Sequence, residues 1–446
     1  MEGVDAGAVN DFFLIICGIW VMFFKFGFTF VELGKTSGSN TANIIFKNLA
    51  DTFITLMAYW LHGYAFAFGE GSGFIGSKYF LTLGSPNLCH FFFNYARCAV
   101  ATTVALGAVI ERTEPIGYLI SSYVFAGFVY PIASHWVWDV HGFFNPLQSK
   151  LPVQDYGGSG VVFLVGGTVA LVACYVIGAR IDRWTPTFKQ REHNLPLAAL
   201  GASMQMMGFI GFIIGARYQI TAPGEGQLAA LCVLNILLAG ASSGLYGLIL
   251  QRLLKSYYDV DCFINTTIAG MVTVCAGANS YIPGISVMCG ATSSFFYFIM
   301  EWLVLRNKID DPLHVISIYL GSGVWGLIFA GFFSAQGTLG GTDKIIGNNL
   351  LAVVVLFSWT VAIMHPLFYV MKYVKVLRIP RFMEKQGKCT EGHRVHTQMY
   401  KRLVHALLTG VVAVVKNLNN VSIMCIERER KIRERLCICK FKKNGR

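Results

Sequence analysis

Charge is scarce in this sequence. Asp, Glu, Lys and Arg make up only 13% of its 446 residues, whereas soluble domains usually carry about 25%. Hydrophobic residues reach 54% and aromatic residues 14%, and they recur in apolar runs long enough to cross a bilayer. A large soluble core would raise the apolar fraction without producing such runs. The composition therefore excludes a soluble domain and predicts an all-α polytopic membrane protein.

Spaced metal ligands and catalytic clusters are also missing. The twelve cysteines show no zinc spacing, and no His/Asp/Glu cluster or nucleophile–base pair stands out. We therefore predict no enzyme activity, no metal and no cofactor. The first ten residues carry no cationic stretch ahead of an apolar one, so no cleaved signal peptide is predicted.

A basic tail accounts for much of the net charge of +12. The last twenty residues hold nine Lys/Arg and three Glu, and the remaining excess lies in short loops between apolar runs. This distribution argues against nucleic acid as a partner. We divide the chain into a transmembrane domain, 1–376, and a cytoplasmic tail, 377–446. The tail either binds anionic lipid or is a solvated segment, and the short apolar run 403–415 predicts an interfacial or buried helix.

Eleven apolar segments approach the roughly 20 residues that a membrane span needs. The predicted spans are 11–33, 42–68, 88–110, 116–138, 158–179, 197–216, 227–250, 263–280, 285–304, 314–334 and 349–371. With the N-terminus outside, ten Lys/Arg fall in inner loops and four in outer loops. The positive-inside rule therefore predicts an N-out, C-in orientation.

The fifth and tenth spans hint at an internal repeat. Asp155 precedes Phe163 by eight residues, Asp311 precedes Tyr319 by eight, and glycines follow each aromatic residue. Spans five apart run in opposite directions, which is the pattern of an inverted repeat with the functional path between its halves. In the second span, Lys47 and Asp51 are spaced to pair across one helical turn.

Several ordered motifs resemble the ammonium transporter (Amt/Rhesus) family, and its Amt branch more than its Rhesus branch. Their order and spacing agree from about residue 11 to 380. The stretch 155–167, DYGGSGVVFLVGG, is similar to the signature of the family's fifth span. The other matching stretches are 63–71, 107–112, 130–138, 193–196 and 310–312.

The resemblance implies two inverted halves of five helices plus a long last helix. It also implies a multi-pass protein of the plasma membrane, a trimer of identical or mixed subunits with one pore each, and ammonium, ammonia or a related small solute as substrate. In the family, an aromatic vestibule recruits ammonium, a phenylalanine pair gates the pore, and two histidines line its dry middle.

Some positions keep the family's chemistry. By resemblance, Trp138 is the vestibule tryptophan, whose ring face attracts a cation, Phe93 and Phe212 are vestibule or gate aromatics, and Asp155 is the structurally or electrostatically required aspartate. The structural alternatives are an interfacial belt for Trp138, lipid-facing packing for the phenylalanines and a helix N-cap for Asp155.

Four positions depart from the pattern. Phe163 and Tyr319 replace the pore histidines, Ala216 replaces the vestibule serine, and Arg97 replaces the gate phenylalanine. A guanidinium about 6 Å from the substrate repels ammonium by roughly 3 kcal/mol at an effective dielectric of about 20, unless Arg97 snorkels to the outer surface. We predict a family member with weakened ammonium conduction. The alternative is a non-conducting sensor, receptor or regulatory subunit of a family trimer.

Overall fold

The computed structural model describes residues 5–84, 87–186, 194–335, 337–338, 344–381 and 384. These residues belong to one compact unit, Met1–Cys389. The predicted interfacial helix at 403–415 and the basic end of the tail lie outside the described residues. The proposed domain boundary at 376/377 falls within the compact unit.

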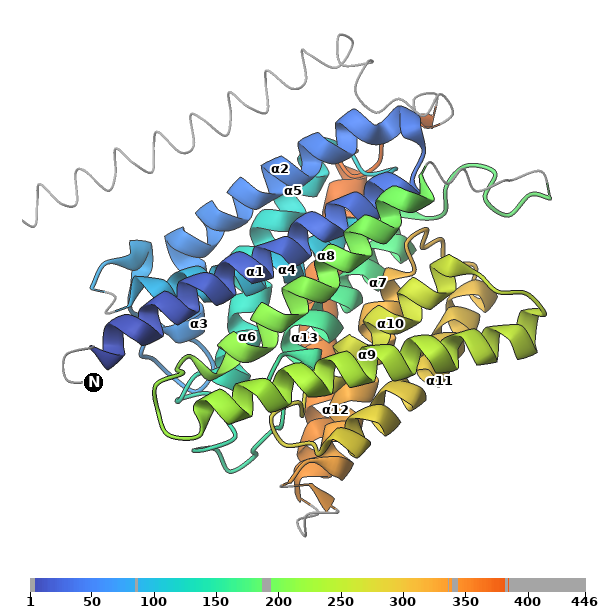
Figure 1. Cartoon of the computed structure of the whole chain (residues 1–446). Helices are drawn as coiled ribbons and strands as arrows, with labels where there is room; N and C mark the ends of the chain where they lie inside the picture. The colour runs from blue at the N-terminus through green and yellow to red at the C-terminus, as the bar shows by residue number, and fades with distance from the viewer. Residues whose placement is uncertain are drawn as a thin grey trace, which may run out of the picture. The chain divides into compact units, whose positions relative to one another are not determined.

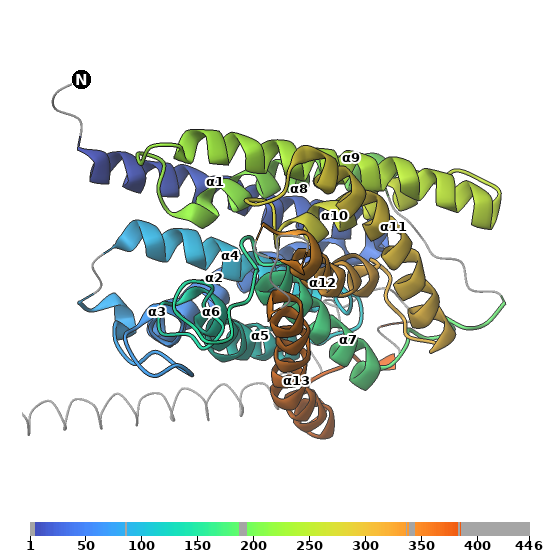
Figure 2. The same ribbon diagram turned by 90° about the horizontal axis from the view of Figure 1, so that it is seen from below.

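The described residues form eleven helical rods (Figures 1 and 2), because two pairs of the thirteen α-helices are continuous. Short π-helical segments join α2 to α3 and α5 to α6. The rods are α1 (Ala6–Lys35), α2–η2–α3 (Thr41–Phe68), α4 (Leu88–Gly107), α5–η4–α6 (Pro115–Trp138), η5–α7 (Ser159–Ile177), α8 (Leu195–Ile214), α9 (Glu225–Lys255), α10 (Val260–Val274), α11 (Pro283–Arg306), η7–α12 (Ile316–Phe333) and α13 (Lys344–Tyr373).

Eight of these rods are long and apolar enough by themselves to cross a membrane. The other three are α2–α3, α4 and α10, which are shorter or carry buried charged residues. All eleven coincide with predicted spans. The largest boundary error is in the eighth span, predicted at 263–280, because the helix ends at Val274 and a turn follows.

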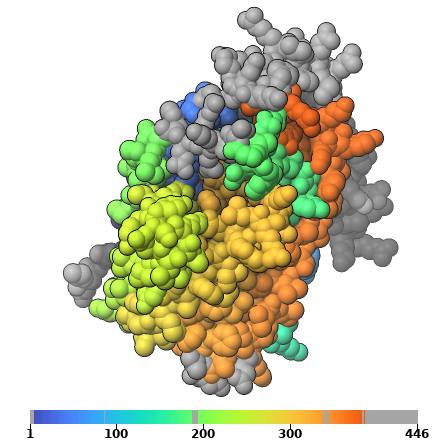
Figure 3. Space-filling model, turned by 90° about the vertical axis from the view of Figure 1, so that its right-hand side faces the viewer, coloured from blue at the N-terminus to red at the C-terminus, as the bar shows by residue number. Residues whose placement is uncertain are grey.

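The outer surface of α9 and α11 is apolar. The two helices pack side by side and form much of the face in Figure 3, where α9 is yellow-green and α11 is gold. Their exposed residues include Leu237, Leu245, Ile249, Phe295 and Trp302. Such a surface suits lipid or another apolar partner rather than water.

The inverted repeat is visible where η5–α7 crosses η7–α12. A Cβ added at Gly167 would lie 2.5 Å from the Leu320 nitrogen, and one at Gly323 would lie 2.8 Å from the Leu164 nitrogen. Each glycine follows its half's pore-position aromatic by four residues, and each leucine follows it by one. The two rods therefore cross through equivalent close contacts that only glycine permits.

Equivalent aspartates precede both crossing rods. Asp155 accepts from the Gly160 backbone N–H at 3.0 Å, and Asp311 accepts from the Ile316 backbone N–H at 2.7 Å. Both carboxylates thus bond the amide five residues ahead and satisfy donors at the start of the rod. Phe163 and Tyr319 both lie in π-helical segments, Ser159–Leu164 and Ile316–Gly321, and such segments are frequent at functional sites.

Candidate functional site: an aromatic column closed by an arginine

Arg97 lies at the centre of an aromatic cage. Its guanidinium carbon is 3.5 Å from the Trp138 ring centroid, 5.1 Å from that of Phe212 and 5.6 Å from that of Phe93. Arg97 is only 1% exposed, so it does not snorkel to the surface, and both phenylalanines are fully buried rather than lipid-facing. The structure brings together all three aromatics that the resemblance assigned to the vestibule and gate.

Few polar groups satisfy this guanidinium. Its Nη1 donates to the Tyr218 hydroxyl at 3.3 Å, whereas Nε and Nη2 have no hydrogen-bond partner among the described residues. Tyr218 in turn donates to the Asn94 side-chain oxygen at 3.2 Å. The ring faces stabilise the charge through cation–π contacts worth about 2 kcal/mol or more when desolvated, and the Asp155 carboxylate also interacts with it electrostatically.

Asp155 supports the tryptophan of the cage. The Trp138 indole nitrogen donates to the Asp155 carbonyl at 2.9 Å. The Asp155 side chain accepts the Gly160 and Val161 N–H groups, each at 3.0 Å. Burial nevertheless raises the pKa of this carboxyl to about 6, because the two N–H bonds offset only part of the desolvation. Asp155 is thus both a helix-start acceptor and the support of the cage wall.

Below the cage, further aromatic rings pack against one another. The Phe163 ring centroid lies 5.6 Å from that of Phe212 and 5.7 Å from that of Tyr319, which it meets nearly parallel at 21°. Phe24 and Phe209 pack against the Phe163 ring at 6.2 and 5.6 Å. Phe163 and Tyr319 are at most 2% exposed. We call Phe212, Phe163 and Tyr319 the aromatic column.

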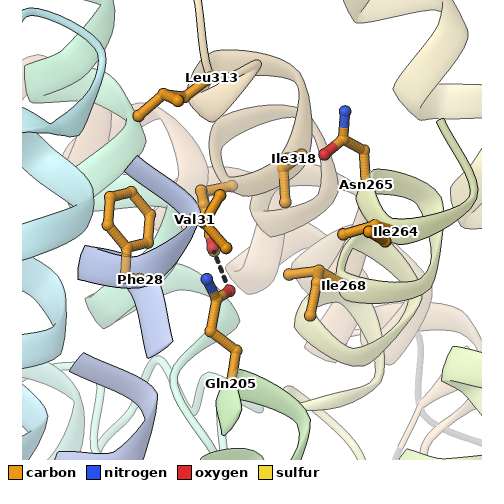
Figure 4. A pocket seen from close by; sticks show the side chains of 9 residues that line it. Phe28, Val31, Gln205, Ile264, Asn265, Ile268, Leu313 and Ile318 are labelled. Atoms are coloured by element: carbon orange, nitrogen blue, oxygen red, sulfur yellow. Dashed lines mark hydrogen bonds between the residues drawn. The ribbon is translucent and has the colours of Figure 1, made fainter. Parts of the chain in front are cut away.

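A small hollow lies at the far end of the column (Figure 4). The Tyr319 hydroxyl donates to the Gln205 side-chain oxygen at 3.0 Å, and Gln205 and Asn265 are the polar residues of the lining. The hollow measures about 20 Å³, room for about one water molecule. At this end of the column, the Tyr319 hydroxyl is therefore already hydrogen-bonded to the Gln205 amide.

No histidine takes the place of the missing pore pair in the described part of the chain. Phe163 and Tyr319 contact each other's rings, and every other ring that contacts either of them in the described residues is a phenylalanine. His62 bonds the Gly127 carbonyl and the Tyr123 hydroxyl, and His365 packs on Tyr369. Among the residues that the structure describes, Gln205 is the only polar side chain bonded to the column.

Sequence reasoning missed four residues around the site: His90, Asn94, Tyr218 and Gln205. The His90 ring centroid lies 4.6 Å from that of Tyr218, with the two rings tilted at 45°, and His90 is one turn before Asn94. The spacing of His90, Asn94 and Arg97 at three and four residues was a usable signal, since such residues share a helix face. Nothing in the sequence indicated Tyr218 or Gln205. Ala216 lies in the short turn Gly215–Arg217, two residues before Tyr218.

The predicted pairing of Lys47 with Asp51 is wrong. The Asp51 carboxylate instead pairs with Lys25 of α1. Lys47 donates to the carbonyls of Ile110 and Thr113 at 2.8 and 2.6 Å, in the segment that follows α4. Helical spacing permitted the local pair, but the packing of α1 and α4 on α2 offered both lysines better acceptors.

The fold and site define a polytopic membrane protein in which two inverted helical halves cross at close glycine contacts. A model of the Ammonium Transporter Family matches residues 12–398. The chain therefore belongs to the ammonium transporter family, as its motif order had indicated.

Relatives and solved structures agree with this assignment. The chain is 31% identical to "Putative ammonium transporter 1" of Caenorhabditis elegans, over 85% of this chain and 77% of that protein. It is 31% identical to "Ammonium transporter 1 member 1" of Arabidopsis thaliana, over 82% and 81%. A solved structure titled "Sensor Amt Protein" matches with a TM-score of 0.79 and 28% identity, over 86% of this chain and 98% of that one. Mep2 of Saccharomyces cerevisiae matches in fold, with a TM-score of 0.76, 21% identity and coverage of 83% and 87%.

Proposed function

We propose that this chain is an ammonium-handling membrane protein whose conduction of ammonium or ammonia is strongly weakened. The observation that carries the proposal is the Arg97 guanidinium, 3.5 Å from the Trp138 ring centroid. By resemblance, this ring face is where the family recruits ammonium. Here a cation from the chain itself occupies it.

Competition and repulsion both act against ammonium at this point. A tethered guanidinium meets the indole face at an effective concentration in the millimolar range or above, without any binding step. An ammonium ion about 6 Å away is repelled by roughly 3 kcal/mol at an effective dielectric of about 20, which is about a hundredfold in occupancy. Ala216 has no hydroxyl to replace a water molecule lost by the substrate.

The aromatic column adds a second barrier in series. Phe163 has no hydrogen-bonding atom, and a small polar solute beside it loses hydration worth several kcal/mol. The Tyr319 hydroxyl already donates to Gln205, so it is not free to donate to an arriving ammonia. Barriers in series are controlled by the highest one, which makes slow conduction the expected result.

Rescue of a host that lacks its own ammonium uptake tests this proposal. The unmodified chain is expected to give growth and labelled methylammonium uptake near background. The combined variant Arg97→Phe, Ala216→Ser, Phe163→His and Tyr319→His is expected to raise uptake at equal surface expression. Rescue by the unmodified chain would overturn the closed-path proposal.

The second candidate is an ammonium sensor, receptor or regulatory subunit. It is favoured by the likeness to a structure titled "Sensor Amt Protein", at 28% identity. A sensor requires binding without throughput, which suits a blocked path. Ammonium-dependent protection from proteolysis in proteoliposomes, without uptake, would support this candidate; uptake at the rate of a histidine-containing family member would remove it.

The membrane arrangement is part of the proposal. We propose a homotrimer or heterotrimer in the plasma membrane, with the N-terminus outside and the tail in the cytoplasm. The loop charge bias of ten to four supports this orientation. An impermeant thiol reagent is expected to spare Cys437 and Cys439 in intact cells and to label them after permeabilisation. Labelling in intact cells would reverse the topology.

A further inference from the structure

Tyr218 is the only hydrogen-bond acceptor that the described residues offer to the Arg97 guanidinium. Arg97 Nη1 donates to the Tyr218 hydroxyl at 3.3 Å, whereas Nε and Nη2 have no partner among these residues. The three aromatic rings also contact the guanidinium, but a ring face attracts a cation anywhere within about 6 Å of its centre. A hydrogen bond depends far more steeply on distance and angle. The Tyr218 hydroxyl is therefore the directional contact of this side chain.

The Tyr218 hydroxyl is itself oriented by Asn94. It donates to the Asn94 side-chain oxygen at 3.2 Å, and the Asn94 amide nitrogen donates to the His90 carbonyl at 3.0 Å, one turn earlier on α4. Because a hydroxyl has a single hydrogen, the bond to Asn94 leaves the oxygen lone pairs to accept from Arg97. Arg97 and Asn94 belong to α4, whereas Tyr218 follows the turn after α8. The hydroxyl therefore connects this turn to α4 at the position of the arginine.

The Tyr218 ring lies at the boundary between the cage and the molecular surface. Tyr218 and His90 are partly exposed, whereas Phe93, Asn94 and Arg97 are at most 1% exposed. The Tyr218 ring centroid is 4.6 Å from that of His90 and 5.9 Å from that of Phe93, which it meets edge-on at 89°. The ring thus contacts a partly exposed residue and a fully buried one, and the hydroxyl reaches the arginine beneath.

The backbone of Tyr218 has a conformation that residues other than glycine rarely adopt. Its φ is 62° and its ψ is 0°, in the left-handed region. The Tyr218 N–H donates to the Gly215 carbonyl at 3.0 Å, and the Asn10 side chain of α1 accepts the N–H groups of Ile220 and Thr221 at 2.8 and 3.2 Å. Such a conformation persists only where the surrounding structure fixes it, and it is frequent at functional sites. The bonds before and after Tyr218 hold it in this position.

We propose that Tyr218 is the positioning residue of the cage, whose hydroxyl holds the Arg97 guanidinium on the face of Trp138. This role rests on the proposed function, in which the guanidinium excludes ammonium from that ring face.

Loss of the hydroxyl changes how long Arg97 occupies the ring. Without it, the guanidinium has no hydrogen-bond acceptor among the described residues, and a long arginine side chain moves its charged end toward water. The Trp138 face is then open for a fraction of the time, and the apparent affinity for a small alkylammonium ion rises with that fraction. Tyr218 thereby sets how strongly the cage excludes ammonium and methylammonium.

The experiment measures methylammonium binding to the full-length protein in detergent by Trp138 fluorescence, with a Trp138→Leu protein as the blank. Tyr218→Phe keeps the ring and removes only the hydroxyl, and it is expected to tighten binding about tenfold. In the Arg97→Met background the same substitution is expected to change the affinity by less than about twofold, because no guanidinium is left to position. A hydroxyl that only stabilised the turn would not produce this dependence on Arg97.

Tyr79→Phe is the matched control. Tyr79 is another partly exposed tyrosine in the left-handed region, with a φ of 72°. Its hydroxyl donates at 3.5 Å to Glu70 of the exposed Lys78–Glu70 pair, outside the cage. The control therefore makes the same chemical change at the same kind of backbone position, and it is expected to leave methylammonium affinity unchanged.

The variants separate failure of this role from failure of the proposed function. If Arg97→Met tightens methylammonium binding but Tyr218→Phe has no more effect than Tyr79→Phe, Tyr218 does not position the arginine. Equal tightening by Tyr218→Phe with and without Arg97 would also overturn the positioning role. If Arg97→Met itself leaves the affinity unchanged, the arginine does not exclude ammonium, and the proposed function fails together with the role of Tyr218.

Discussion

Two buried arginines in this protein have opposite surroundings. Arg112, in the turn that follows α4, donates to the Asp310 carbonyl at 2.7 Å, and its Nη1 lies 3.8 Å from the Asp310 carboxylate. Arg97, within α4 itself, has three rings and one hydroxyl around it. Neither is more than 1% exposed. Arg112 is part of an ionic network. Among the described residues, no carboxylate forms a salt bridge with Arg97.

The difference lies in how each buried charge is surrounded. Around Arg112, Arg180 forms salt bridges with Glu111 and Asp310 at 2.7 and 2.8 Å, and Arg183 forms one with Asp310 at 3.1 Å. The positive charges of this cluster are therefore neutralised by hydrogen-bonded carboxylates. A fold that needed only stability would gain little from leaving Arg97 among rings, since a phenylalanine there would avoid the desolvation cost. Under the proposed function, the position of Arg97 is explained by its effect on cations in the cage.

The largest expected effect comes from the paired cluster. Asp310→Asn leaves Arg112 and Arg180 without their shared carboxylate and is expected to cost about 3–5 kcal/mol of stability. Thermal unfolding in detergent, compared with the exposed-pair control Glu70→Gln, measures the loss. If Asp310→Asn lowers the unfolding temperature no more than Glu70→Gln does, the buried cluster contributes no more to stability than an exposed ion pair.

The same cluster predicts a pH dependence. Hydrogen bonds from Arg180 and the charge of Arg112 hold the pKa of the Asp310 carboxyl down to about 2, despite burial. A depressed carboxyl pKa stabilises the folded state above its unfolded value of about 3.9, and this contribution is lost as the pH falls toward 2. Acid unfolding should therefore begin at a higher pH in Asp310→Asn. Coinciding acid transitions in the two proteins would contradict this.

Next in size is the effect of emptying the cage. Arg97→Met keeps an unbranched side chain and replaces its charged end by an apolar one. Methylammonium binding is therefore expected to tighten about a hundredfold, the equivalent of roughly 3 kcal/mol. Quenching of Trp138 fluorescence, checked in a Trp138→Leu background, measures the binding. Arg217→Met, which removes a half-exposed arginine paired with Glu225, is the matched control. Equal affinities in the two arginine variants would show that Arg97 does not control the cage.

The sequence predicted the eleven rods and their class well, because span-length apolar runs are a strong signal. It also identified Arg97, Trp138 and Phe163 as neighbours on one path, but only through the motif order. Composition and spacing alone do not reveal that α4 and α6 meet there. The partners of Lys25 and Gln205 could not be predicted, since both depend on which helices pack together.

A smaller effect is expected at the lower end of the column. Tyr319→Phe removes the hydroxyl that donates to Gln205 and leaves a buried amide with one partner fewer. The expected cost is about 1–3 kcal/mol of stability, with no gain in uptake. Tyr246→Phe on the exposed face of α9 is the control for the same substitution and is expected to cost little. If both variants unfold at the same temperature, the Tyr319–Gln205 bond contributes nothing to stability.

The smallest expected effect belongs to Phe163→His alone, although it restores one residue of the family's pore pair. The new imidazole would still face Phe24, Phe209, Phe212 and Tyr319, so it would gain a polar atom without a polar neighbour. Arg97 would continue to occupy the cage above it. Methylammonium uptake is therefore expected to stay near background, at a surface level equal to that of the unmodified chain. Arg97→Met combined with Phe163→His separates the two barriers. Uptake restored by the single substitution would place the controlling barrier in the column, whereas uptake that appears only in the double variant would show that the arginine still limits uptake after the column is opened.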